Sequence, residues 1–267
     1  MGEEVYLDLI KSILINGEDK ESRNGKTLSC FGTTSKYNIS NFTVPLLTTK
    51  KINFDVILKE LLWFISGSTN SRDLKSKIWD KWSDNGELGP IYGFQWRHAG
   101  EEYKTCYDKY EGIDQLQNII DTIKTDPGSR RLVIDSWDVS QINRMKLPPC
   151  HYSSIFSVTN NKISCHLIQR SGDIGIGVPF NIVTYSILTH IIAKMLDLES
   201  KELVHTISNA HIYYPHIEPL KEQLNRKPFM FPRIKIPKYN DINDYKLEDF
   251  ELIGYESHPR IKMEVFE

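Results

Sequence analysis

The chain has 267 residues, of which 40% are hydrophobic and 25% are charged, and its formal net charge is −2. This composition is typical of a folded protein with a sizeable core, and it argues against disorder. The nearly neutral charge argues against general electrostatic binding to nucleic acid or to an anionic membrane, so any anion site must be local.

The sequence has no recognisable signal peptide and no apolar run of membrane-spanning length. Its cysteines form no CxxC pair and lack the spacing of a zinc site; they are Cys30, Cys106, Cys150 and Cys165. We therefore expect a cytoplasmic protein with free thiols and no metal. We also expect a single domain over residues 1–267, with a small charged surface insert at about 98–112.

Apolar residues at helical spacing predict a helix over Val5–Leu14, followed by a polar, turn-rich loop over residues 17–26. Arg23 lies in that loop, where it is either a solvated charge or part of an anion site. Strands are predicted after it, over Thr27–Phe31 and Ser35–Ile39.

A strongly amphipathic helix is predicted over Ile52–Ser66, with Glu60 among its apolar residues. Burial would raise the pKa of this carboxyl group, which suits a proton shuttle. The alternative is that Glu60 lies at the edge of the apolar stripe and pairs with a lysine. A short polar helix is predicted over Asn70–Lys77.

Residues 78–97 combine three tryptophans, a tyrosine and a phenylalanine in loop-like sequence. Aromatic residues between glycines and prolines often line a pocket for a flat ligand. They could equally form a satellite core under a long loop. A helix is predicted next, over Ile113–Lys124.

Arg130 and Arg131 stand at the start of a strand predicted over Leu132–Trp137. Two guanidinium groups match the oxygens of a phosphate. Neighbouring strand residues point to opposite faces, however. Both arginines could bind anions only if one site lies within the subunit and another across an interface, or if the strand has not yet begun.

Cys150 follows two prolines and precedes a strand predicted over Tyr152–Val158. A hairpin turn leads to a second strand, over Lys162–Gln169, which brings Arg170 into the neighbourhood. A guanidinium group beside a thiol favours the thiolate, so Cys150 is a candidate nucleophile. His151 is not expected to act as its base, because successive strand residues point to opposite faces.

The glycines of residues 172–177 match neither a dinucleotide-binding fingerprint nor a P-loop. Asn181 precedes a helix predicted over Ile182–Leu196, where it is either an N-cap or a ligand contact. Its amide could pair with the donor–acceptor edge of a uracil. Farther on, His211 and Tyr213 would share a face in an extended segment.

Six segments together resemble the signature segments of the thymidylate synthase family, in the same order along the chain: KELLWFISGSTN, IWDKW, LGPIYGFQWR, LPPCH, QRSGDIGIGVPFN and HIYYPHIEPLKEQL. The resemblance extends from about Val5 to the C-terminus. The HAGEEYK…YEGIDQLQ insert and the IKME ending are similar to the eukaryotic branch.

This resemblance implies an α+β fold with a large twisted mixed sheet flanked by helices, the sheets of two subunits packing back to back in a homodimer. The implied activity is a methyltransferase of nucleotide biosynthesis that converts dUMP to dTMP. The co-substrate 5,10-methylenetetrahydrofolate would give both the one-carbon unit and the hydride, leaving dihydrofolate.

The resemblance also implies residue roles. Cys150 would attack C6 of the uracil, Arg170 would hold the charge of the sulfur, and Asn181 would bind the pyrimidine edge. Glu60 would run the proton network around O4, with Tyr92 helping at C5. The implied dUMP site is Arg23, Arg130, Arg131, Arg170, Ser171, Asp173, Asn181, His211 and Tyr213, with Arg130 and Arg131 donated by the partner subunit. The implied folate site is Lys50, Trp79, Asp173, Gly177, Phe180 and Val265.

Several positions depart from the family pattern. The loop at Arg23 is one residue shorter, Ile155 replaces a glutamine, and Ser208 and Asn209 replace Gly-Asp. The ending Val265-Phe266-Glu267 replaces a small apolar residue and valine. Since the family's C-terminus closes over the folate, we expect this ending to affect the rate of turnover more than the kind of reaction that the enzyme catalyses.

Two other functions compete with this interpretation. A deoxyuridylate hydroxymethylase would share the fold and the thiol, but water would trap the one-carbon intermediate. Its cytidylate counterparts carry aspartate at the amide position, so Asn181 argues for uracil. A nucleic-acid-binding protein that uses Arg130 and Arg131 is disfavoured by the neutral charge and the lack of a basic stripe.

Overall fold

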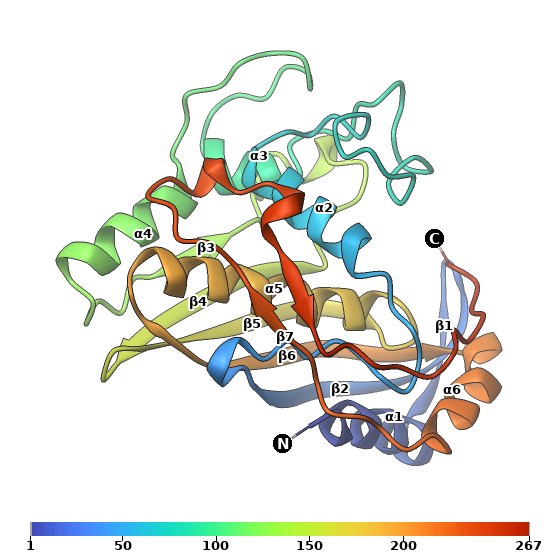
Figure 1. Cartoon of the computed structure of the whole chain (residues 1–267). Helices are drawn as coiled ribbons and strands as arrows, with labels where there is room; N and C mark the ends of the chain where they lie inside the picture. Colours follow the sequence, from blue (N-terminus) through green and yellow to red (C-terminus); the bar gives the residue numbers. More distant parts are fainter. Residues whose placement is uncertain (1, 267) are drawn as a thin grey trace.

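A six-stranded mixed sheet forms the centre of the computed structural model, which describes residues 2–266 (Figure 1). The strand order is β1-β2-β6-β5-β4-β3; β5 and β6 are parallel and the other neighbours are antiparallel. The predicted α+β class with a large mixed sheet is confirmed. The strands are β1 (Glu18–Ser22), β2 (Gly25–Asn38), β3 (Val133–Asp135), β4 (His151–Thr159), β5 (Lys162–Asp173) and β6 (Glu199–Tyr213).

Helix α5 lies between the sheet and helix α2 (Figure 1). It packs on β5 and β6, and α2 packs on it in turn. Almost every α5 side chain is buried, as expected of a helix that is apolar on all sides. The helices are α1 (Glu4–Asn16), α2 (Phe54–Ile65), α3 (Tyr92–His98), α4 (Gln115–Thr125), α5 (Gly177–Met195) and α6 (Ile217–Leu224).

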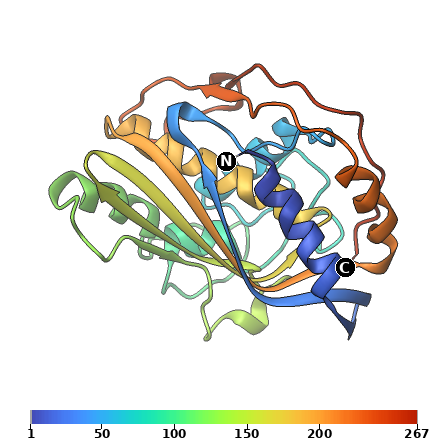
Figure 2. The ribbon, with the colours of Figure 1, turned by 90° about the horizontal axis from the view of Figure 1, so that it is seen from below.

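The C-terminal segment returns along the molecule and ends beside the β1–β2 hairpin, as both views show (Figures 1 and 2). On its way it forms a small antiparallel pair of strands, β7 (Arg233–Lys235) and β8 (Glu251–Ile253). The C-terminal segment therefore ends near the β1–β2 hairpin, whereas α1 begins well away from this hairpin. Within residues 2–266 no helix combines the length and the apolar character that crossing a membrane requires.

The segment predicted as a loop over residues 17–26 is instead a β-hairpin, made by β1 and the start of β2. Gly25 has a φ of 116°, which glycine adopts without strain, and it permits the tight turn at Arg23 and Asn24. The two strands predicted on either side of Gly32 are one continuous strand, because β6 pairs with β2 on both sides of that glycine.

The polar helix predicted over Asn70–Lys77 does not form. Lys75 has a φ of 52°, which an α-helix excludes, and the Ser71 amide donates to the Gly86 carbonyl at 2.9 Å. Conversely, the aromatic segment predicted as loop over residues 78–97 ends in helix α3. The predicted hairpin turn is confirmed, with φ values of 50° and 59° at Asn160 and Asn161.

Candidate active site

Cys150 lies immediately before β4, beside the end of β5. The Arg170 amide donates to its carbonyl at 2.8 Å, and its own amide donates to the Tyr92 hydroxyl at 2.8 Å. The Arg170 guanidinium Nη2 is 3.6 Å from the Cys150 sulfur. The thiol is therefore held by the β4–β5 pairing on one side and by α3 on the other.

The Arg170 guanidinium group is fixed before any ligand binds. Its Nε donates to the Pro149 carbonyl and its Nη2 to the Pro148 carbonyl, both at 2.8 Å. Trp137 lies against it, 5.6 Å from ring centre to guanidinium carbon. These two hydrogen bonds hold the guanidinium group in one orientation, so its charge is preorganised beside the sulfur.

The thiol itself is less acidic than the sequence suggested. Burial raises the pKa of Cys150, and the lowering effect of Arg170 is smaller. The predicted effect of the guanidinium group is present, because Arg170 lowers the pKa of Cys150, but in the free site desolvation outweighs the charge. A ligand that brings further positive charge or hydrogen bonds to this site would shift the balance towards the thiolate.

His151 belongs to an aromatic group and not to the thiol. Its ring stacks on Tyr92 at 4.2 Å between centres, and its Nδ1 is 3.0 Å from the Tyr185 hydroxyl. Burial lowers its pKa to about 3, so the ring is neutral near pH 7. This arrangement agrees with the expectation that His151 is not the base of Cys150.

Glu60 is buried on α2, with 9% of its surface exposed. Its partner is Trp79, whose indole Nε1 donates to the carboxylate at 2.7 Å. The alternative of a lysine pair is thus wrong. Burial raises the pKa of Glu60 to about 7, and the Trp79 hydrogen bond opposes that rise. A carboxyl group with this pKa can take up or release a proton at neutral pH.

Aromatic rings connect Glu60 to the thiol. The ring centres of Trp79 and Phe64 lie 6.0 and 4.9 Å from that of Tyr92. The Tyr92 hydroxyl in turn accepts a hydrogen bond from the Cys150 amide. Both Trp79 and Tyr92 are almost fully buried. The aromatic segment is therefore largely core, the second of its two predicted interpretations, but it is the part of the core that backs the site.

Asn181 lies inside α5, one turn after its start at Gly177, so the N-cap interpretation is wrong. The helix begins earlier because Pro179 is compatible with a first turn, where its missing amide hydrogen costs nothing. Asn181 is 9% exposed, and its Oδ1 accepts a hydrogen bond from Gln169 Nε2 at 3.1 Å. Ser171 and Phe180 lie half-buried near the same β5–α5 connection.

The C-terminal tail covers the end of β5. Lys50 Nζ donates to the Gly175 carbonyl at 2.5 Å and lies 3.9 Å from the Met263 sulfur. Only 4% of Lys50 is exposed, and burial lowers its pKa to about 8. In this arrangement the ammonium group is enclosed, and it could meet a ligand only after Met263 moved away. Asp173 Oδ1 accepts the Gly175 amide at 2.8 Å.

The last described side chain, Phe266, stacks on Tyr213 at 4.5 Å. Tyr213 also meets His211 edge-on at 5.2 Å, as their shared face on β6 predicts. The Glu264 carbonyl lies 2.7 Å from His216 Nε2, whereas Val265 points outward with 52% of its surface exposed. The remaining residue of the unusual ending, Glu267, lies outside the described residues.

Two of the arginines predicted for phosphate binding, Arg130 and Arg131, lie far from Cys150 within one chain. Arg23 is exposed at the hairpin tip, where its Nε donates to Asn24 Oδ1 at 3.1 Å. Arg130 and Arg131 are exposed and precede β3, as one of the predicted alternatives requires. The Leu132 carbonyl accepts from the Phe156 amide, which places Arg131 beside Ser157. At about 3.3 Å per residue, that is roughly 23 Å along β4 from Cys150.

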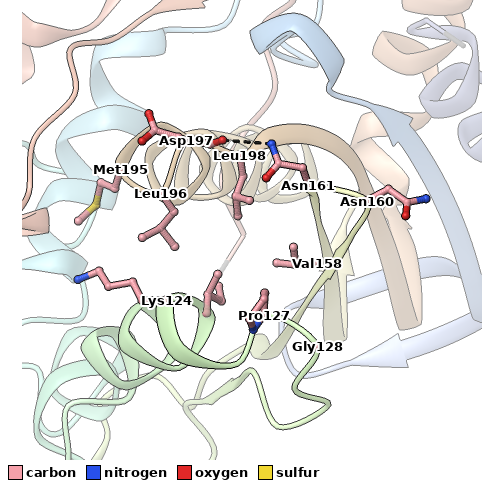
Figure 3. A pocket seen from close by; sticks show the side chains of 11 residues that line it. Lys124, Pro127, Gly128, Val158, Asn160, Asn161, Met195, Leu196, Asp197 and Leu198 are labelled. Carbon is pink, nitrogen blue, oxygen red and sulfur yellow. Dashed lines mark hydrogen bonds between the residues drawn. The ribbon is translucent and has the colours of Figure 1, made fainter.

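A hollow of about 550 Å³ opens at the far end of β4 and β5, between α4 and the end of α5 (Figure 3). Val158, Leu196 and Leu198 line it, and Asn161 Nδ2 donates to the Asp197 carbonyl at its rim. Val158 lies eight residues along the chain from Cys150, roughly 26 Å away at about 3.3 Å per residue. None of the residues predicted for chemistry lines the hollow, so it is not part of the candidate active site.

Sequence reasoning missed three polar side chains behind the site: Gln169, Tyr185 and His205. All three are almost completely buried. The available signal was their position, since each interrupts a run of inward-facing apolar residues in a strand or in the core helix. A buried polar residue normally requires a partner.

The comparisons with known proteins agree with this geometry. The family model described as thymidylate synthase matches residues 4–267. The thymidylate synthase of varicella-zoster virus (strain Dumas) is 49% identical over 99% of this chain and 94% of its own length. The human thymidylate synthase is 47% identical over 99% of this chain and 90% of its own length. That of Saccharomyces cerevisiae is 45% identical over 98% of this chain and 96% of its own length. The chain belongs to the thymidylate synthase family.

Proposed function

We propose that this chain is a methyltransferase that reductively methylates dUMP to dTMP, with 5,10-methylenetetrahydrofolate as co-substrate and dihydrofolate as co-product. The observation that carries the proposal is the Cys150 thiol 3.6 Å from a fixed guanidinium group, within a chain that matches the thymidylate synthase family along nearly its whole length. Asn181 and Glu60 supply the polar groups that a uracil ring requires.

Cys150 begins the reaction by bonding through its sulfur to C6 of the uracil. The electrons of the C5–C6 double bond move towards C4 and its oxygen, which makes C5 nucleophilic. Arg170 stabilises the sulfur anion before the attack and again when the sulfur leaves. This electrostatic support is needed because burial alone raises the pKa of the thiol.

Glu60 donates a proton to O4 of the uracil and accepts it back. With a pKa of about 7, its carboxyl group can protonate the oxygen as charge develops there and recover the proton later. The Trp79 hydrogen bond fixes the carboxylate in place. The Tyr92 hydroxyl accepts a hydrogen bond from the Cys150 amide, and in this proposal Tyr92 assists removal of the C5 proton.

The residues around Asp173 fit a folate. Asp173 uses Oδ1 for the Gly175 amide and is partly exposed, so the carboxylate can accept hydrogen bonds from the amine-bearing edge of a pterin. Trp79 and Phe180 would flank the ring, with Gly177, Val265 and Lys50 around it. When bound, the folate supplies the one-carbon unit and the hydride.

We further propose that the active form is a homodimer in which Arg130 and Arg131 bind the phosphate in the partner's site, together with Arg23, Arg170 and Ser171. Two observations support this. The arginines lie roughly 23 Å from Cys150 of their own chain. The sheet face opposite α5 also carries a half-buried row of Ile155, His166 and Val204, a row suited to packing against a second sheet.

The proposal is tested by mixing the protein with dUMP and 5,10-methylenetetrahydrofolate. We expect dihydrofolate, followed by its absorbance, and dTMP in equal amounts. Formation of tetrahydrofolate and 5-hydroxymethyl-dUMP would overturn the proposal in favour of a hydroxymethylase. Absence of turnover, with strongly salt-dependent binding to duplex or RNA, would instead support a nucleic-acid-binding protein.

A further inference from the structure

A chain of buried hydrogen bonds runs from β6 through β5 to α5 and ends at Asn181. His205 Nε2 is 2.8 Å from Gln169 Oε1, and Gln169 Nε2 donates to Asn181 Oδ1 at 3.1 Å. His205 and Gln169 are each 2% exposed. The three residues come from neighbouring elements, since β5 pairs with β6 and α5 crosses both (Figure 1).

The orientation of the Gln169 amide is fixed by its surroundings. Gln169 Nε2 also donates to the Ser171 carbonyl at 2.9 Å, and a carbonyl can only accept. The other end of the amide, Oε1, must then accept from His205. Burial lowers the pKa of His205 to about 3, so the ring is neutral, and the nitrogen that faces the carbonyl oxygen carries its single hydrogen.

This fixed glutamine determines the orientation of Asn181. If the Asn181 amide turned over, its NH2 group would face the NH2 group of Gln169, and two buried donors would oppose each other. An unsatisfied buried donor is costly. The Oδ1 of Asn181 therefore faces Gln169, and only one donor–acceptor arrangement remains available to a ligand.

We propose that Gln169 and His205 are positioning residues that fix the Asn181 amide in the orientation that pairs with uracil and rejects cytosine. The inference rests on the proposed function, since it concerns the nucleobase of the same substrate. In one pose, uracil offers a donor at N3 and an acceptor at O4, whereas cytosine offers an acceptor at N3 and a donor at N4. The two bases therefore require opposite orientations of the same amide.

The variant Gln169→Glu tests the proposal. Burial keeps a carboxyl group neutral at this position, so it can donate its proton to the Ser171 carbonyl and accept from His205. The lone pair of the hydroxyl oxygen that faces Asn181 can accept a hydrogen bond but cannot donate one. The Asn181 amide would therefore have to turn over and present its NH2 group. We expect the affinity ratio of dCMP to dUMP, measured by tryptophan fluorescence titration, to rise on the order of 10- to 100-fold.

His205→Phe provides a second variant if Gln169→Glu does not fold. It removes the donor to Gln169 and should shift the ratio in the same direction by a smaller factor. His190→Phe is the matched control, because His190 is also a buried histidine but bonds to Ser200 and to the Thr43 carbonyl. Its ratio should equal that of the wild type even if its stability falls.

Wild-type turnover separates the two hypotheses. If the wild type does not convert dUMP, the proposed function fails. If the wild type is active but folded Gln169→Glu, or His205→Phe in its place, discriminates between dUMP and dCMP as the wild type does, the positioning role is overturned. A general loss of affinity for both nucleotides, with the ratio unchanged, also counts against the proposal, because a merely structural role would produce it.

Discussion

Replacement of Glu60 by glutamine should stabilise the protein at alkaline pH while it removes activity. The folded-state pKa of Glu60 is raised from 4.5 to about 7 by burial. Below the lower value the carboxyl group is protonated in both folded and unfolded chains. As the pH rises, the unfolded chain loses the proton first, so the wild type loses stability between about pH 4.5 and 7 and carries the full penalty above pH 7.

The size of this penalty follows from the shift. A pKa difference of roughly 2.5 units corresponds to about 3 kcal/mol at about 1.4 kcal/mol per unit. Glutamine has the shape of the protonated acid, and its Oε1 can still accept from the Trp79 indole. The unfolding free energy of Glu60→Gln should therefore exceed that of the wild type by no more than about 1 kcal/mol at pH 5 and by about 3 kcal/mol at pH 8.

Urea unfolding of both proteins at pH 5 and pH 8, at one protomer concentration, measures the difference. Glu218→Gln is the control, since the Glu218 side chain is 79% exposed and pairs with Lys221 at the surface. Its effect should be small and similar at both pH values. A pH-independent effect of Glu60→Gln would refute the reasoning, because it would mean that Glu60 ionises in the folded protein as it does in water.

Three further predictions concern the site. Cys150→Ser should abolish turnover but retain dUMP binding in a fluorescence titration, because the nucleophile is lost and the anion site is not; loss of both would contradict the assigned role. Phe266→Ala removes the stack on Tyr213 and should loosen the tail, so that an amine-reactive label, read by mass spectrometry, modifies Lys50 faster; unchanged labelling would argue against a tail that encloses it. Mixing Cys150→Ser with Arg131→Ala subunits should restore activity at one site per heterodimer; no recovery on subunit exchange would exclude donation of Arg131 across the interface.

Local sequence alone was sufficient for several elements of the site. The prolines before Cys150, the Asn160-Asn161 turn and the strand that leads to Arg170 are close in sequence, and a hairpin turns sequence proximity into spatial proximity. The apolar periodicity of α2 placed Glu60 among apolar residues, but it left open whether the carboxyl group is buried or pairs with a lysine at the edge of the stripe. The long ordered segments were enough to predict the family.

Only the tertiary structure decided the partners and the protonation states. Trp79 bonds to Glu60 from a loop that follows α2, and His205 on β6 bonds to Gln169 on the neighbouring strand β5. No periodicity in the sequence relates the two members of either pair. The pKa of Cys150 depends on a balance between burial and the charge of Arg170, and sequence shows the charge but not the burial. Desolvation and hydrogen-bond geometry are properties of packed neighbours, and these exist only once distant segments have come together.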